Sequence, residues 1–217
     1  MPALILRVLF IGNSLTFANN LPAMVSAIGH QQGVTIECET VAFPDFSLGD
    51  HVQRGDAVRA IARGGWSFVV LQQGPSALAE SRVQLRASVR TLDRAVRRAG
   101  AKTALYMVWP AANRLGDFDR VRESYAVATA DVQGLLLPAG EAWRAAWRRD
   151  PTLALYGSDG VHPTPLGTYL AALVVYRKLT ERSPVGLPLT LTSASGEFPS
   201  ITLSAGEAAL LQQAAAR

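Results

Sequence analysis

Short apolar segments alternate along the chain with longer segments in which apolar residues recur every three or four positions. The apolar runs predict strands at 3–11, 34–42, 67–72, 102–109 and 132–138. The periodic segments predict helices at about 20–32, 50–63, 79–99, 118–130, 139–149 and 164–180. This alternation is typical of an α/β protein with a parallel sheet between two layers of helices. The strand runs are continuously apolar, as expected for strands covered on both faces.

The segment after the last of these helices has a different composition. Residues 181–200 are rich in Pro, Ser, Thr and Gly and predict irregular structure. Residues 204–216 then predict a terminal helix, capped by Ser204 with Glu207 three positions later. With no internal repeat or linker, we expect a single domain over 1–217, with a core at about 4–180 and an extension at 181–217.

Composition narrows the class of protein. Hydrophobic residues make up 49% of the chain and charged residues 18%, which is typical of a globular protein. One cysteine, Cys38, cannot form an internal disulfide. The apolar N-terminal run is too short to span a bilayer and lacks the features of a signal peptide, so we expect a cytoplasmic protein without membrane association.

The net charge of +4 comes mostly from arginine, which gathers on one predicted helix. Five arginines lie four residues apart and so share one helix face: Arg82, Arg86, Arg90, Arg94 and Arg98. Apolar residues of the same helix are expected to turn toward the core. No aromatic residues alternate with the arginines, so we interpret the stripe as a solvated face rather than a nucleic-acid site.

In parallel sheets of this kind, ligands bind at the carboxyl ends of the strands. The loops there lack the glycine patterns that hold dinucleotides or phosphates, and the chain has no HExxH or paired CxxC motif. We therefore expect neither a cofactor nor a metal ion. No GxSxG turn occurs, which argues against an ordinary α/β-hydrolase.

Two loops at this edge nevertheless carry complementary chemistry. Ser14 follows the first strand in "FIGNSLT", and His162 lies in "YGSDGVHPTPLG" three residues after Asp159. A serine hydroxyl attacks a carbonyl only when an imidazole takes its proton and a carboxylate orients that imidazole. Taken alone, Ser14 could simply cap a helix and Asp159 could be a turn residue. On two loops at one sheet edge, the three residues predict a catalytic triad.

The blocks "FIGNSLT" and "DGVHPT" resemble the first and last sequence blocks of the SGNH hydrolases, the GDSL-type esterases and lipases. The resemblance covers about residues 4–180, and the segments "NNLPAMVSAI" and "SLGDHV" are also similar to a bacterial branch of that superfamily. It implies a three-layer α/β/α fold of flavodoxin-like topology with a five-stranded parallel sheet. It also implies Ser14 as nucleophile, His162 as general base and Asp159 as its orienting partner.

Two blocks depart from the family pattern, and both concern the oxyanion hole. The second block normally supplies a glycine N–H; here "FPDFSLGDH" puts Asp45 at that place, with Gly49 as the alternative in a shifted register. The third block normally supplies an asparagine side chain. Here "LQQGPS" offers Gln72, Gln73 or Ser76, of which we prefer the Gln72 amide.

The resemblance predicts a serine esterase that cleaves carboxylic esters through an acyl-enzyme, with Ser14, Asp45 and Gln72 forming the oxyanion hole. The substrate would be a small molecule with a short acyl chain or an acetylated carbohydrate. Phe17, Phe43 and Trp109 lie near strand ends, where they can line its pocket. The alternative is a non-catalytic domain that binds an anion at "GNSLT". The sequence leaves the oligomeric state open.

Overall fold

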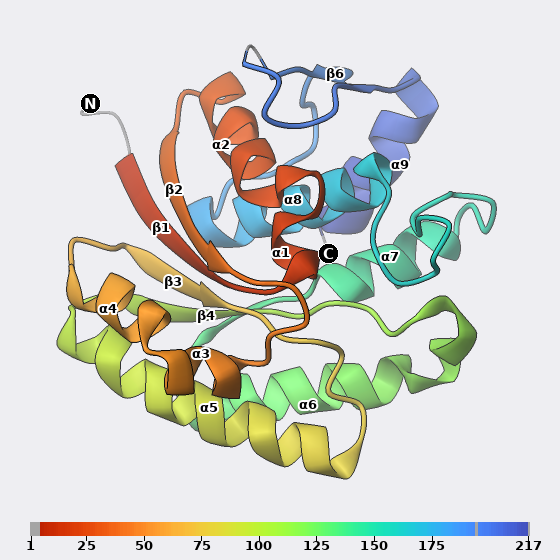
Figure 1. The fold of residues 1–217 in the computed structure, drawn as a ribbon. Coiled ribbons are helices and arrows are strands. Elements are labelled where there is room, and N and C mark those ends of the chain that lie inside the picture. The colour runs from red at the N-terminus through yellow and green to blue at the C-terminus, as the bar shows by residue number, and fades with distance from the viewer. Residues whose placement is uncertain (1–4, 194, 217) are drawn as a thin grey trace.

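The predicted apolar runs form one five-stranded parallel sheet (Figure 1). The computed structural model describes residues 5–193 and 195–216, so positions 3 and 4 of the first predicted strand lie outside the described residues. The strands are β1 (Ile5–Gly12), β2 (Thr35–Ala42), β3 (Phe68–Leu71), β4 (Lys102–Tyr106) and β5 (Leu135–Leu137). Their order, β2-β1-β3-β4-β5, is the flavodoxin-like order, which confirms the predicted fold class.

Helices cover both faces of the sheet (Figure 1). One layer contains α2 (Leu21–Gln31), α7 (Ala139–Trp147), α8 (Pro165–Thr180) and α9 (Ala205–Ala215). The other contains α3 (Leu48–Arg54), α4 (Asp56–Ala62), α5 (Ala79–Arg98) and α6 (Phe118–Asp131). The helix predicted at 50–63 is thus two helices. Gly55 separates them because its φ of +83° ends α3 and starts α4 in a conformation that favours glycine.

Alternating side chains of β1 fill the two cores. Val8 and Phe10 pack into the layer that contains α2 and α8, while Leu9 and Ile11 pack into the opposite layer. All four are fully buried, which is why the strand reads as one continuous apolar run. Parallel pairing with β2 and β3 places the carboxyl end of β1 at the same sheet edge as theirs.

A tryptophan pair lies beneath the carboxyl edge. Trp109 and Trp143 stack with ring centroids 3.5 Å apart and planes inclined by 10°, and both are buried. The Trp109 Nε1–H donates to the Val161 carbonyl at 3.1 Å, and the Trp143 Nε1–H donates to the Gly167 carbonyl at 3.2 Å. The pair therefore ties the residue before His162 to the protein core.

The C-terminal extension packs back onto the domain. Its irregular part contains a two-stranded antiparallel pair, β6 (Thr190–Leu191) and β7 (Ile201–Thr202). The predicted terminal helix is α9, which packs against α7 and α8, and the capping box of Ser204 with Glu207 is present. Within the described part of the chain, no helix combines the length and the apolar character needed to cross a bilayer.

Three of the five arginines in the stripe on α5 form ion pairs with acidic residues of α6. Arg82 pairs with Glu123 at 2.9 Å, and Arg86 and Arg90 both pair with Asp131, at 2.7 and 3.0 Å. Exposed or partly exposed ion pairs of this kind add little stability individually. They nevertheless show that part of the stripe joins two neighbouring helices rather than facing only solvent.

Candidate active site

The first loop of the site is a tight strand-to-helix turn. Strand β1 ends at Gly12, and the four-residue helix α1 (Ser14–Phe17) begins two residues later. Asn13, not Ser14, caps this helix, because the Asn13 side chain accepts a hydrogen bond from the Leu15 N–H at 3.1 Å. Ser14 is therefore free of the capping role. The turn lies between β1 and β3, where the strand order reverses, which is the usual ligand site of such sheets.

The structure brings together the three residues of the predicted triad. His162 Nε2 lies 2.8 Å from Ser14 Oγ, and His162 Nδ1 lies 2.5 Å from Asp159 Oδ2. With Asp159 accepting the Nδ1–H, the neutral imidazole presents an unprotonated Nε2 to the serine hydroxyl. This is the arrangement that general-base activation of a serine requires.

Asp159 and His162 belong to one preorganised loop. Asp159 Oδ1 accepts the backbone N–H groups of Val161 and His162, each at 2.9 Å, while Oδ2 contacts the imidazole. These hydrogen bonds, with that of the His162 side chain the largest cause, lower the pKa of Asp159 to about 2. The carboxylate is therefore ionised at neutral pH. The Asp159 and His162 side chains are 50% and 42% exposed, so the site is open to solvent.

A residue that the sequence analysis missed joins the two loops. After α1, the 3-10 helix η1 (Ala18–Asn20) places the Asn19 amide beside the His162 loop. Its Nδ2 group donates to the Pro163 carbonyl at 3.0 Å and to Thr168 Oγ1 at 2.9 Å. The backbone of Asn19 has a φ of +50°, which asparagine tolerates better than most residues. The signal available in the sequence was the Asn19–Asn20 pair shortly after Ser14, because asparagine is enriched at left-handed positions.

The structure gives Gln72 a different place from the one expected. Its side chain is fully buried and makes four hydrogen bonds, so neither amide N–H is free to donate to an oxyanion. Oε1 accepts from the Asn13 N–H at 2.9 Å and from Thr16 Oγ1 at 2.6 Å. Nε2 donates to Asn13 Oδ1 at 2.9 Å and to the Gln73 carbonyl at 2.7 Å. Gln72 thus fixes the turn that carries Ser14 through hydrogen bonds to Asn13 and Thr16.

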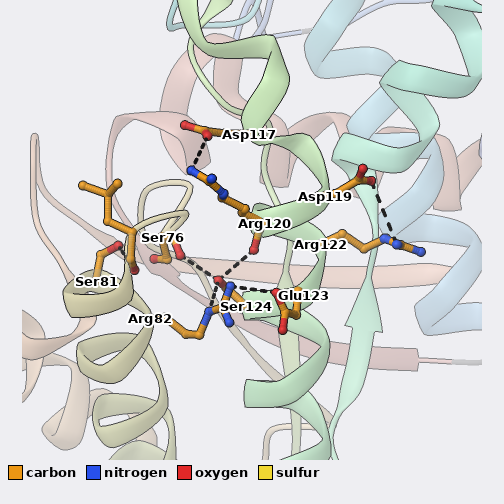
Figure 2. A network of polar contacts seen from close by, with 10 residues as sticks. Ser76, Ser81, Arg82, Asp117, Asp119, Arg120, Arg122, Glu123 and Ser124 are labelled. Carbon is orange, nitrogen blue, oxygen red and sulfur yellow. Dashed lines mark hydrogen bonds and ion pairs between the residues drawn. The ribbon is translucent and has the colours of Figure 1, made fainter.

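Gln73 and Ser76 are the other two candidates for the side-chain donor of the oxyanion hole. Both form hydrogen bonds mainly with each other and with neighbouring loops and helices. Gln73 Nε2 donates to Ser76 Oγ at 2.8 Å, and Gln73 Oε1 accepts the Leu48 N–H at 3.1 Å. The Ser76 carbonyl accepts from Ser124 Oγ at 2.7 Å, and Arg82 Nε donates to that same hydroxyl at 3.0 Å (Figure 2). Both Gln73 and Ser76 are buried. These contacts anchor the loop after β3 to α6.

The second-block alternatives lie in different places. Asp45 is exposed in a turn over residues 43–46, with a φ of +60°, and the Phe46 carbonyl of that turn accepts from Asn13 Nδ2 at 3.0 Å. Gly49 instead lies in α3, where an added Cβ would contact Ser88 of α5. The turn that contains Asp45 is therefore the one that adjoins the Ser14 turn. Within the described residues, neither the Ser14 N–H nor the Asp45 N–H donates to another group.

The other histidines and the candidate pocket aromatics lie in different environments. His30 is exposed, whereas His51 is fully buried and hydrogen-bonded to the Gly12 carbonyl. Phe17 is 40% exposed beside the site, whereas Trp109 is buried in the tryptophan stack and does not line an open pocket. Over residues 5–193 and 195–216, no three His, Cys, Asp or Glu side chains gather in a way that could hold a metal ion.

Comparison with known proteins gives two kinds of result. No protein-family model and no curated protein matches the chain. Among solved structures, a DUF4886 family protein from Bacteroides uniformis aligns with a TM-score of 0.79 at 19% identity, over 97% of this chain and 93% of that one. An acetyl-xylooligosaccharide esterase variant from Geobacillus Stearmophilus aligns with a TM-score of 0.64 at 16% identity, over 80% and 93%. These two show the fold alone.

A further solved structure has a closer sequence. It is a protein from Slackia heliotrinireducens described as a candidate SGNH hydrolase, and it is 32% identical to this chain with a TM-score of 0.66. The alignment covers 81% of this chain and 99% of the Slackia protein. The fold and the residues gathered at the carboxyl edge agree with that similarity. The chain belongs to the SGNH hydrolase superfamily.

Proposed function

We propose that this hydrolase is a serine esterase that cleaves carboxylic esters through an acyl-enzyme on Ser14. The observation that carries the proposal is the continuous contact from Ser14 Oγ through the His162 imidazole to the Asp159 carboxylate. Each of the two contacts has hydrogen-bond length, so the proton path exists before a substrate binds.

The chemistry follows from the roles of the three groups. His162 Nε2 takes the Ser14 hydroxyl proton while Oγ attacks the ester carbonyl carbon. Asp159 stabilises the imidazolium that forms. The imidazolium then donates its proton to the leaving alkoxide as the C–O bond breaks, which leaves an acyl-enzyme. A water molecule activated by the same imidazole attacks this acyl group and releases the carboxylic acid.

The oxyanion of both tetrahedral intermediates needs donors that the protein holds in place. We assign this role to the backbone N–H groups of Ser14 and Asp45, since within the described residues neither donates elsewhere. Gln72, whose amide is occupied, holds the turn instead. The hole would therefore be built from backbone groups of two adjacent loops.

The open site suits esters of bulky alcohols. The Asp159 and His162 side chains are about half exposed, so a bulky alcohol such as a carbohydrate can approach without entering a deep tunnel. The structurally similar Geobacillus protein is described as an acetyl-xylooligosaccharide esterase, which is consistent with this class of substrate. We propose acetylated carbohydrates and short-chain esters as the substrates.

The non-catalytic alternative has less support. An anion site at a helix N-terminus uses several free N–H groups and the dipole of a helix. Helix α1 has only four residues, and the Leu15 N–H is already bound by the Asn13 side chain. This turn is therefore a poor anion cradle.

A fluorophosphonate probe tests the proposal directly. It should attach covalently to the wild-type protein, and mass spectrometry should locate it on Ser14. A panel of acetyl, butyryl and longer esters, together with acetylated sugars, should show fastest hydrolysis of the acetyl compounds. No labelling and no hydrolysis across this panel would contradict the proposal.

A further inference from the structure

A buried histidine lies against the turn that carries Ser14. His51, on α3, has no exposed surface, and its Nε2 lies 2.7 Å from the Gly12 carbonyl oxygen. Its ring packs against Phe43 and Phe46, with centroids 5.8 and 5.2 Å apart. A carbonyl oxygen only accepts hydrogen bonds, so Nε2 must carry the proton.

The other ring nitrogen has no partner in the described structure. His51 Nδ1 is buried without a hydrogen bond. Burial also lowers the pKa of His51, so the ring is neutral at pH 7 with its proton on Nε2. An unpartnered buried acceptor disfavours the folded state. The hydrogen bond from Nε2 to the Gly12 carbonyl offsets part of this cost.

The Gly12 carbonyl belongs to the peptide that joins Gly12 to Asn13, the residue before Ser14. The N–H of the same unit, on Asn13, donates to Gln72 Oε1 at 2.9 Å. The carbonyl side of this peptide is therefore held by His51 at 2.7 Å and, at the longer distance of 3.3 Å, by the Phe43 N–H, while Gln72 holds the N–H side. No side chain fits at Gly12, because a Cβ there would clash with Gln72 and Thr16. The peptide plane has little freedom to rotate.

We infer that His51 is a positioning residue for Ser14: its Nε2–H fixes the Gly12–Asn13 peptide and so aims the serine Oγ at His162. This inference rests on the proposed esterase function. Rotation of that peptide would move the backbone from which Ser14 extends and lengthen its 2.8 Å contact with His162. His51 lies beneath the turn and touches no substrate. Its loss should therefore slow acylation without weakening substrate binding.

Three substitutions separate the hydrogen bond from the volume of the ring. His51→Phe keeps an aromatic ring but has no donor. His51→Gln keeps an N–H donor near the position of Nε2, and His51→Asn carries the same amide one methylene shorter. For His51→Phe we expect kcat and the fluorophosphonate labelling rate to fall ~10-fold or more at nearly unchanged KM. His51→Gln should recover most of this loss, and His51→Asn should not.

The outcomes that overturn the inference are distinct from failure of the proposed function. A wild-type protein that neither labels nor hydrolyses any ester removes the esterase proposal. If the wild type is active, a His51→Phe variant with wild-type kcat contradicts the positioning role. If His51→Phe does not fold, equal kcat for His51→Gln and His51→Asn contradicts it.

A measurement independent of activity completes the test. The ¹⁵N chemical shifts of the wild-type His51 ring should be those of the neutral tautomer protonated on Nε2. A ring protonated on Nδ1 cannot donate to Gly12 and would overturn the inference, whether or not the protein is an active esterase.

Discussion

Ser14 Oγ and His162 Nε2 lie 2.8 Å apart, although 148 residues separate them in the chain. Asp159 and His162, by contrast, are three residues apart and share a loop whose backbone N–H groups bind the carboxylate. Asp159 and His162 are thus organised locally, while Ser14 is brought to them by the sheet.

Replacing Ser14 with alanine should lower ester hydrolysis by at least ~10³-fold and abolish fluorophosphonate labelling, because no other hydroxyl replaces Oγ at the imidazole. The free energy of unfolding should change by no more than about 0.5 kcal/mol, since Asn13 provides the helix cap. Assays with an acetyl ester and urea denaturation measure the two quantities. Ser81→Ala on α5 is the control and should leave both unchanged. An active Ser14→Ala variant would exclude Ser14 as the nucleophile.

The Asp159 carboxyl should titrate with a midpoint near pH 2, because the His162 hydrogen bond and two backbone N–H groups favour its ionised form. NMR of the side-chain carboxyl carbon between pH 1.5 and 6 measures this midpoint. In His162→Ala it should rise toward the ~3.9 of an unperturbed aspartate. Because the folded pKa is lowered, the carboxylate stabilises the native state above the unfolded pKa, and this stabilisation is lost as pH falls through about 2. A wild-type midpoint near 4 would contradict the loop geometry.

Gln72→Leu should destabilise the protein by about 2–4 kcal/mol, because it leaves the Asn13 N–H and the buried Thr16 hydroxyl without partners. Urea denaturation measures this loss. Activity should also fall, since the Ser14 turn loses its support. The contrasting result, an unchanged unfolding free energy with kcat lower by ~10²-fold, would return the oxyanion role to the Gln72 amide.

Asp45→Gly should stabilise the protein by about 0.5–1 kcal/mol, because the φ of +60° at this position suits glycine better than aspartate. Its kcat should equal or exceed that of the wild type, since the backbone N–H stays and a carboxylate is removed from the site. Asp45→Asn removes the charge alone and separates the two effects. A tenfold loss of kcat in both variants would mean that the carboxylate itself takes part.

The fold was largely predictable because the central strands β1, β3 and β4 are covered on both faces over most of their length. The central strands therefore carry continuous apolar runs, such as Val8 to Ile11 in β1, and the loops between elements are short. The break at Gly55 was missed, since one glycine in a helical pattern signals a break only when its φ is known. The meeting of Ser14 with His162 followed from the rule that parallel strands place their carboxyl ends at one edge.

The donors around Ser14 were not predictable in the same way. Gln72 stands at a strand end, where a long amide can point either into the site or back under the turn. Only packing decides, and here Asn13 and Thr16 take up its polar atoms. The role of His51 was hidden for the same reason, because a hydrogen bond to a main-chain carbonyl leaves no sequence pattern.

The stacked tryptophans have a consequence for spectroscopy. Two indoles with centroids 3.5 Å apart and nearly parallel planes share their electronic excitation, which gives paired bands of opposite sign in circular dichroism. One indole is hydrogen-bonded to the carbonyl of Val161, next to His162. Loosening of the His162 loop would change the stacking and weaken these bands. The protein therefore carries an intrinsic optical reporter of whether the loop that contains His162 is in place.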